Sequence, residues 1–395
     1  MKERRGIIEM DLAKYGPKPG PGQASAVSLD EARAYCRRLA GSHYENFSVL
    51  SPLVPERCRA DFAAVYAFCR WADDLADESG SRDRALELLA WWRGELEALG
   101  AGEARHPVFV ALRESFARCG LEAAPFGDLI SAFELDQTKA RYATWDEVLG
   151  YCRLSANPVG RIVLRVLGER CDDAQLAASD ALCTALQLTN HWQDIRRDWT
   201  ERGRIYIPAD MHDIADFESR LAGTIERGYS ADRAFWGESR RLVRRLVART
   251  WDVYGAAEPL VAGASREVQP LLWLFAAGGR TVLWNIERWN CETVLERPKL
   301  SAPRKVALVL RAMAMQRFGW SAPALPLPSA WIVDPEPDPD AERYPRRIEA
   351  AAVPTPGAAD STPGAADSTP GAAESTPGAA DSTPGAADST PESVA

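Results

Sequence analysis

Apolar residues recur at the spacing of an α-helix through most of the chain between Ser28 and Phe318. The intervals i, i+3 and i+4 are repeated in six long segments, 55–79, 84–99, 145–168, 173–200, 231–260 and 267–293. No stretch alternates apolar and polar residues for more than a few positions, as a half-buried strand would. The pattern predicts a single all-α domain, too large for a four-helix bundle, in which many helices surround a central cavity.

Capping signals support this reading at the points where helices should begin. Ser28-Leu-Asp-Glu31 and Thr144-Trp-Asp-Glu147 have the spacing of a capping box, in which a hydroxyl and a carboxylate satisfy the first backbone N–H groups of a helix. Prolines, which are tolerated in the first turn of a helix, stand at positions 55, 107, 125, 208 and 303. We therefore expect helices to begin near these residues.

The two ends of the 395-residue chain differ in composition from the helical body. From Pro354 the chain repeats the unit Thr-Pro-Gly-Ala-Ala-Asp-Ser, which contains Pro and Gly but no large apolar residue. Such a segment can neither propagate a helix nor bury a core, and it names no partner. We expect a loose leader over 1–27, the helical domain over 28–320, a linker over 321–353 and a disordered repeat tail over 354–395.

Charge and composition exclude several classes of function. The net charge is −9, which is unfavourable for binding nucleic acid. Eight cysteines without a CxxC pair indicate a reducing compartment, and four histidines without ligand spacing argue against zinc. No segment is long and apolar enough to span a membrane, and no secretory signal is recognised. We expect a cytoplasmic protein, with peripheral membrane contact left open.

Two helical segments each carry a row of polar residues at helical spacing, which we call a polar stripe. The residues of each stripe are separated by three or four positions, so they share one helix face: Tyr66, Arg70, Asp73 and Asp77 in the first, and Gln187, Asn190, Asp194 and Asp198 in the second. Partly buried carboxylates of like charge are unfavourable unless a cation neutralises them, and oxygen ligands select Mg²⁺ or Mn²⁺. Facing stripes would form a metal-bridged diphosphate site. The alternative is that each stripe is a solvated acidic surface.

The stripes resemble the two aspartate-rich motifs of the squalene/phytoene synthase family, the head-to-head prenyl-diphosphate synthases. Three further stretches resemble family motifs and stand in the family's order: His43-Tyr-Glu-Asn-Phe47, Tyr151-Cys-Arg-Leu-Ser-Ala-Asn-Pro-Val-Gly160 and Arg204-Ile-Tyr-Ile-Pro208. Within the family, Ser155-Ala-Asn-Pro-Val-Gly160, Gln193 and the closing Arg204-Ile-Tyr-Ile-Pro208 are similar to the HpnC-type branch of hopanoid biosynthesis. Leu154 departs from the aromatic residue often found at its position, so no role is expected there.

The resemblance implies an isoprenoid-synthase fold and roles for fourteen residues. The implied Mg²⁺ ligands, with Mn²⁺ as a second option, are Asp73, Asp77, Asp194 and Asp198. The residues expected to bind the prenyl diphosphate substrate are His43, Phe47, Gln187, Asn190, Arg204 and Tyr206. The residues expected to take part in the chemistry are Tyr66, Arg70, Tyr151 and Asn157, of which Asn157 would position a water.

The implied reaction is the loss of diphosphate from presqualene diphosphate, which is made from two farnesyl diphosphates. In the HpnC-type branch, water is expected to capture the final cation and give hydroxysqualene, so NADPH is not expected. One alternative is a squalene or phytoene synthase proper, which uses NADPH or loses a proton. Another is a non-catalytic assembly factor with the family's fold, but such a protein would be expected to lose the aspartates that this chain retains.

Overall fold

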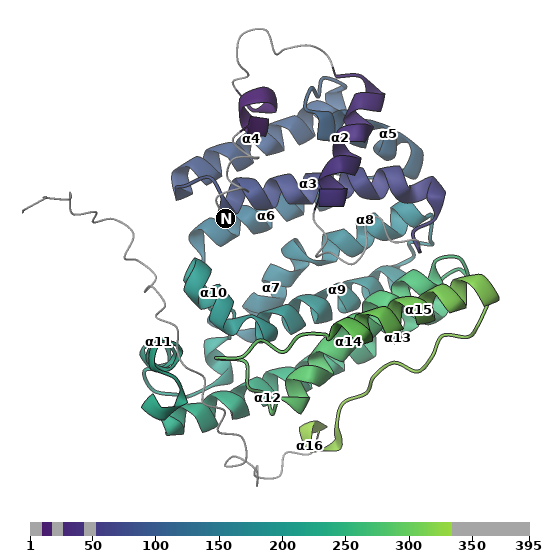
Figure 1. Ribbon diagram of the computed structural model, residues 1–395. Coiled ribbons are helices and arrows are strands. Elements are labelled where there is room, and N and C mark those ends of the chain that lie inside the picture. Colours follow the sequence, from purple (N-terminus) through teal and green to yellow (C-terminus); the bar gives the residue numbers. More distant parts are fainter. Residues whose placement is uncertain (1–9, 18–26, 43–52, 334–395) are drawn as a thin grey trace, which may run out of the picture. The chain divides into compact units, whose positions relative to one another are not determined.

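Every regular element in the described part of the chain is a helix. The computed structural model describes residues 10–17, 27–42 and 53–333, and its helices are shown in Figure 1. The first half contains α2 (Leu29–Ser42), α3 (Arg59–Asp77), α4 (Arg82–Ala101), α5 (Pro107–Cys119), α6 (Ala123–Thr138), α7 (Trp145–Ser155), α8 (Asn157–Leu167) and α9 (Asp173–Gln193). The second contains α10 (Ile195–Arg202), α11 (Phe217–Arg227), α12 (Arg233–Ala256), α13 (Glu258–Gly263), α14 (Gln269–Arg288), α15 (Ala302–Phe318) and α16 (Ala330–Val333). The all-α prediction is confirmed, whereas the central cavity stays a prediction.

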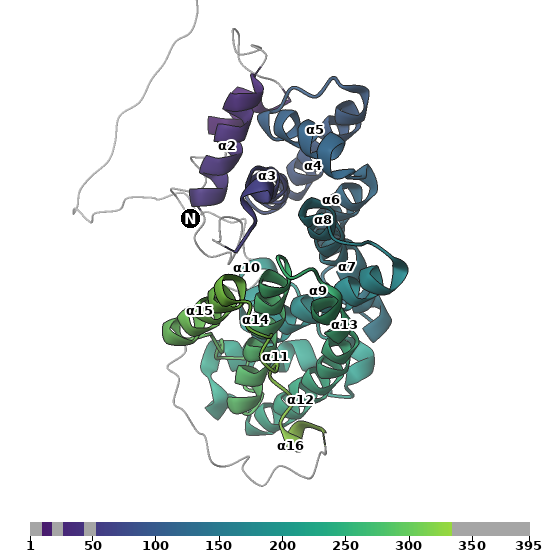
Figure 2. The ribbon, with the colours of Figure 1, turned by 90° about the vertical axis from the view of Figure 1, so that its right-hand side faces the viewer.

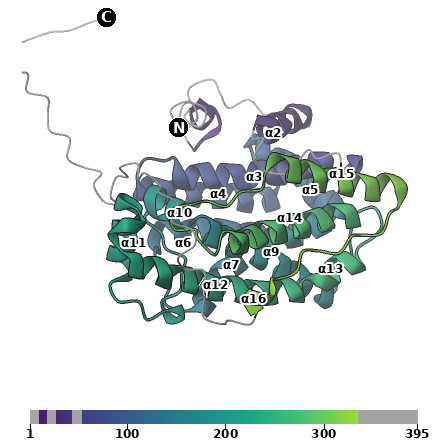
Figure 3. The ribbon, with the colours of Figure 1, turned by 60° about the horizontal axis from the view of Figure 1, so that its bottom comes forward.

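Two helices lie inside the packing, and they carry the first polar stripe and the beginning of the second. α3 packs against α2, α4, α5 and α6, while α9 packs against α7, α8, α12, α13 and α14 (Figures 2 and 3). Burial on several sides explains why both helices are rich in Ala, and α9 also in Leu, because small and aliphatic side chains allow neighbouring helices to approach. The first stripe, and Gln187 and Asn190 of the second, therefore lie on central helices rather than on loops.

An aromatic cluster fixes α3 against α4 and α5. The Trp71 and Trp92 rings are stacked with centroids 5.4 Å apart, and the Phe68 ring meets Phe109 edge to face at 5.8 Å. The indole N–H of Trp71 donates to the Tyr35 hydroxyl at 2.9 Å, which ties α2 to the same cluster. Buried aromatic side chains contribute strongly to stability, so α3 has a well-anchored position.

The first capping box is confirmed, and the second differs in detail. The Ser28 backbone N–H donates to the Glu31 carboxylate at 2.9 Å, and the Glu31 N–H donates to the Ser28 hydroxyl at 3.3 Å. Thr144 caps α7 in the same way, since its hydroxyl accepts the Glu147 N–H at 3.2 Å. The Glu147 carboxylate, however, accepts the N–H of Ala143, one residue before the cap.

Three of the predicted helical segments are broken in the structure. The segment 231–260 is divided at Ala257, between α12 and α13. The segment 145–168 is divided at Ala156, because Pro158 in the first turn of α8 lacks an N–H and crowds the preceding backbone. The segment 173–200 is divided at Asp194, whose φ of −109° and ψ of 19° are not helical. The second stripe therefore continues from α9 into α10 instead of lying on one helix.

Both predicted flanking segments contact the helical domain where the structure describes them. In the predicted leader, residues 10–15 are helical, and Asp11 accepts a hydrogen bond from the Tyr35 hydroxyl at 2.7 Å. In the predicted linker, Pro323 accepts the Trp273 indole N–H at 3.0 Å. The repeat tail, 354–395, lies outside the described residues. No helix in the described ranges is long and apolar enough to cross a membrane.

Candidate active site

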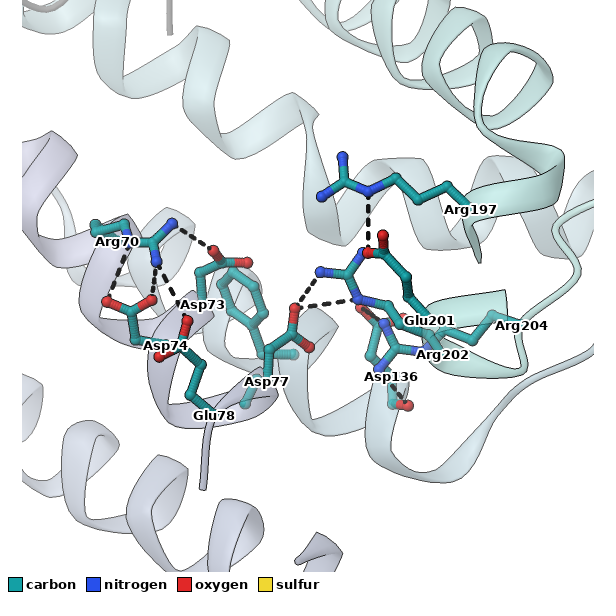
Figure 4. A network of polar contacts seen from close by, with 12 residues as sticks. Arg70, Asp73, Asp74, Asp77, Glu78, Asp136, Arg197, Glu201, Arg202 and Arg204 are labelled. Atoms are coloured by element: carbon teal, nitrogen blue, oxygen red, sulfur yellow. Dashed lines mark hydrogen bonds and ion pairs between the residues drawn. The ribbon is translucent and has the colours of Figure 1, made fainter. Parts of the chain in front are cut away.

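The first motif lies on the C-terminal half of α3, where Arg70 holds the carboxylates beside it. Its guanidinium donates to Asp73 at 3.2 Å through Nη1 and to Asp74 at 3.0 Å through Nε (Figure 4). Burial and the neighbouring Asp77 charge raise the pKa of Asp73. Tyr66, one turn before Arg70, is half-buried against the core. Burial and the neighbouring carboxylate therefore disfavour the charged form of Asp73, although Arg70 pairs with it.

An ion pair joins the first motif to the second. Arg202, in the last turn of α10, donates from Nε to the Asp77 carboxylate at 3.1 Å and also approaches it through Nη2 (Figure 4). Burial lowers the pKa of this guanidinium, but carboxylates from both stripes raise it by more. Those carboxylates are Asp77, Asp73 and Asp198. The expectation that the two stripes face one another therefore agrees with the geometry.

The second motif is held by the segment that follows α14. Asp194 pairs with Arg297, whose Nη2 donates at 2.9 Å, and the adjacent Gln193 amide donates to the Pro298 carbonyl. Burial, together with the Asp194 charge, raises the pKa of Asp198 to about 7. On α9, Gln187 is half-buried and Asn190 is exposed. Gln193, noted in the sequence as a mark of one family branch, thus anchors the segment that carries the Arg297 partner of Asp194.

A buried carboxylate, Asp136 at the end of α6, gathers three of the predicted residues. It accepts the Tyr151 hydroxyl at 2.9 Å and the Tyr206 hydroxyl at 3.2 Å. The Arg204 guanidinium lies 3.4 Å from the same carboxylate and donates to the Asp136 backbone carbonyl at 3.0 Å. Burial raises the pKa of Asp136, although Arg204 opposes the shift. Arg204 is therefore bound to protein in this structure.

An aromatic wall stands beside this carboxylate. The His191 ring stacks on the Tyr206 ring with centroids 3.8 Å apart, and Tyr151 lies 5.2 Å from Tyr206. Burial lowers the pKa of His191 to about 3, so its imidazole is neutral at physiological pH. The wall consequently offers aromatic faces next to a carboxylate, with no imidazolium among them.

The sequence reasoning missed three residues that organise the site. Asp136 follows Phe133 and Leu129 at helical spacing, so its position on an apolar helix face was a readable signal. Arg202 stands four residues after Asp198, which extends the second stripe by one turn. Arg297 gave no signal, because its contact with Asp194 joins distant parts of the chain.

Asn157 lies apart from the Asp136 cluster. Its side-chain oxygen accepts the Thr184 hydroxyl at 2.8 Å. It lines a hollow of about 530 Å³ together with Leu154, Pro158 and residues from α6 and α9. The α7 residues that line the hollow are Gly150, Arg153 and Leu154, and Tyr151 of the aromatic wall is not among them.

Other members of the motifs have structural partners or lie outside the described residues. Gly160 is required by close packing, because a Cβ there would approach the Ser179 Oγ to 2.5 Å and the Cys183 Sγ to 2.6 Å. His43 and Phe47, both predicted to bind substrate, are outside the described residues.

The aspartates of the two motifs are the predicted metal ligands, but most of them pair with arginines in this structure. Within residues 10–17, 27–42 and 53–333, no three side chains of His, Cys, Asp or Glu are close enough together to hold a metal ion. Three of the four predicted ligands are paired instead, Asp73 with Arg70, Asp77 with Arg202 and Asp194 with Arg297. The donor set still fits a hard divalent cation, since it consists of carboxylate oxygens.

The chain belongs to the squalene/phytoene synthase family, whose model matches residues 40–304. It is similar to a hydroxysqualene synthase from Rhodopseudomonas palustris, 40% identical over 219 residues that cover 55% of this chain and 70% of that protein. A hydroxysqualene synthase from Sinorhizobium fredii is 46% identical over 167 residues, covering 42% of this chain and 56% of that protein.

A solved structure supports the same assignment. Squalene synthase HpnC from Alicyclobacillus acidocaldarius is 39% identical, with a TM-score of 0.58 over 68% of this chain and 97% of that one. A dehydrosqualene synthase at 22% identity, also with a TM-score of 0.58, shares the fold. The predicted family and fold are confirmed, and the chain is an enzyme of this family rather than a non-catalytic relative.

Proposed function

We propose that the chain is a hydroxysqualene synthase, which ionises presqualene diphosphate and captures the resulting cation with water. The observation that supports the proposal is the ion pair between Asp77 of the first motif and Arg202, which stands four residues after the last aspartate of the second motif. The names of the two hydroxysqualene synthases, at 40% and 46% identity, support this choice of reaction. Presqualene diphosphate, made from two farnesyl diphosphates, is the proposed substrate.

The arginines that hold the motif carboxylates would bind the diphosphate. We assign this role to Arg70, Arg202 and Arg297, each of which now pairs with a carboxylate and would exchange it for phosphate oxygens. Charge-assisted hydrogen bonds from guanidinium groups stabilise a diphosphate as its charge develops. Arg204, which binds Asp136, would position the tyrosines rather than reach the leaving group.

The carboxylates released by this exchange would hold Mg²⁺, with Mn²⁺ as the alternative ion. The proposed ligands are Asp73, Asp77, Asp194 and Asp198. A bound divalent ion would supply Lewis-acid neutralisation of the leaving diphosphate. The raised pKa values of Asp73 and Asp198 support the assignment, because burial and a neighbouring carboxylate disfavour their charged forms, and a bound cation would relieve this.

The aromatic wall would protect the cation after the diphosphate leaves. Tyr151 and Tyr206 are the proposed aromatic partners of the cation, and cation–π contacts contribute roughly 0.5–2 kcal/mol each. The Asp136 carboxylate fixes both hydroxyls and adds a negative charge nearby. Neutral His191, stacked on Tyr206, does not oppose the cation.

Asn157 is the proposed residue that positions the quenching water. Its oxygen is occupied by the Thr184 hydroxyl, so the amide nitrogen would hold the water. Asn157→Gly should lower the proportion of alcohol among the products while diphosphate release continues. An unchanged product ratio would remove this residue from the quenching step.

Product identification tests the proposed reaction. The full chain is incubated with presqualene diphosphate or farnesyl diphosphate and Mg²⁺, with and without NADPH, and the extracted products are identified by mass spectrometry. Hydroxysqualene formed without NADPH is the expected result. Squalene formed only with NADPH would instead support a squalene synthase, the activity named for the Alicyclobacillus structure. Failure to convert either substrate would refute the proposal.

A further inference from the structure

Apolar side chains are exposed along one face of α15. Val306 and Leu310 are 56% and 58% exposed, and Met313 is 39% exposed. Their spacing of four and three residues places them on the same face. Ala312 and Met315 are buried on the side that packs against α14. The helix therefore has an apolar inner face, as expected, and a second apolar face that is exposed.

The turn after α15 extends the exposed apolar face. Phe318 and Trp320 are 66% and 56% exposed, and their ring centroids lie 5.6 Å apart. Gly319 between them has a φ of 64°, a left-handed conformation that ends the helix. Exposed aromatic pairs are costly in water but favourable at a bilayer interface. We call Val306, Leu310, Met313, Phe318 and Trp320 the α15 surface.

The charged residues of the segment that carries this surface are all basic. Residues 297–333 contain six Lys and Arg residues and no Asp or Glu, in a chain whose net charge is −9. Lys305, Arg311 and Arg317 are exposed on α15 itself. An apolar face with a basic border is typical of helices that lie in the headgroup region of anionic membranes.

We propose that the α15 surface docks the protein onto an anionic lipid bilayer. α15 has 17 residues, and no helix in the described part of the chain could cross a membrane, so it would lie in the plane of the interface. Charge complementarity favours lipid over a second copy of this chain. A symmetric dimer through this face would bring the two sets of basic residues together.

This surface is separate from the proposed reaction. The family match ends at residue 304, so the α15 surface lies beyond the matched region. None of its side chains belongs to the aspartate motifs or to the Asp136 cluster. Membrane docking can therefore succeed or fail independently of the proposed hydroxysqualene synthase activity.

Vesicle flotation of the full chain tests the proposal. Vesicles of phosphatidylcholine alone are compared with vesicles that also contain phosphatidylglycerol, at low and high salt. The protein should float with the anionic vesicles, and salt should release it because screening weakens the charge contribution. Leu310→Ser with Trp320→Ser, and separately Lys305→Glu with Arg317→Glu, should each weaken binding by about tenfold or more.

Two matched controls test whether the loss of binding is specific to the α15 surface, because they replace an exposed apolar residue and an exposed basic residue elsewhere in the chain. Met10, which is 74% exposed, is replaced by Ser, and exposed Arg82 at the start of α4 is replaced by Glu. Both controls should bind as the wild type does, and thermal unfolding checks that every variant is folded.

Any one of three results would overturn the proposal. These are a wild type that does not float with anionic vesicles, α15 variants that bind as strongly as the wild type, and controls that lose binding as much as the α15 variants do. Analytical ultracentrifugation adds one further outcome. If the Leu310 and Trp320 variant converted a wild-type dimer to a monomer and left flotation unchanged, a second copy would be the occupant.

Discussion

Replacing Asp136 with Asn keeps the shape of the side chain and removes its charge. The carboxylate accepts hydroxyls from Tyr151 and Tyr206 and faces the Arg204 guanidinium at 3.4 Å. In the Asp136→Asn variant, the amide oxygen can still accept a hydrogen bond. The amide NH2 group replaces the second carboxylate oxygen, so its hydrogens point at a neighbouring group that is itself a donor. The guanidinium, whose side chain is only 10% exposed, also loses its counter-charge.

The expected loss of folding free energy depends on how deeply the Asp136–Arg204 ion pair is buried. Removing one partner of a buried ion pair destabilises a protein by about 3–5 kcal/mol. Arg204 retains its bond to the Asp136 backbone carbonyl, and the burial that raises the Asp136 pKa shows that the carboxylate already carries a desolvation cost. We therefore expect the free energy of unfolding to fall by the lower end of this range, about 3 kcal/mol. At roughly 2–4 °C per kcal/mol, the Tm should fall by about 6–12 °C.

Urea unfolding followed by circular dichroism measures this loss. The matched control is Glu134→Gln, on the same helix, which removes a half-exposed pair with Arg93 at 2.8 Å and should cost less than about 1 kcal/mol. In an Arg204→Met background, Asp136→Asn should cost at least about 1 kcal/mol less than in the wild type. A loss below about 1 kcal/mol, or an equal loss in both backgrounds, would refute the reasoning.

Two further predictions concern stability. Burial lowers the pKa of His106 to about 3 from 6.5, so the unfolded chain binds a proton that the folded chain excludes, and stability should fall as the pH drops from 6.5 toward 3. His106→Asn, which removes this group from the start of α5, should flatten the dependence of Tm on pH, and an unchanged slope would contradict this. Gly160→Ala should destabilise by about 1–3 kcal/mol because its Cβ would clash with Ser179 and Cys183. Gly94→Ala, in an open helix position, should be neutral or stabilise by about 0.5–1 kcal/mol, and equal urea midpoints for the two variants would refute the packing argument.

Much of the fold and the core of the site could be predicted because both depend on local periodicity. The stripe on α3 lies on one helix face as its spacing of four, three and four residues requires. The Ser28 capping box depends on residues three apart, so it too is encoded locally. Such features are readable because neighbouring residues alone determine them.

The remaining features depend on contacts between distant segments. The break at Asp194 occurs where Gln193 and Asp194 bind residues more than one hundred positions later. Arg204, in the loop after α10, has the charge to bind diphosphate, but Asp136 at the end of α6 holds it. The helical period of a sequence predicts which face of its helix a residue occupies. It does not predict which side chain from another element contacts that residue.

Diphosphate release from presqualene diphosphate is the most direct measurement of the proposed chemistry. It is followed with Mg²⁺ present, in the wild type and in the Asp73→Ala and Asp194→Ala variants, with exposed Glu87→Ala on α4 as the control. The wild type and the control should release diphosphate, chelation by EDTA should stop the release, and each aspartate variant should be inactive while still folded. Release that continues in either aspartate variant, or after chelation, would contradict a metal-assisted ionisation between the two motifs.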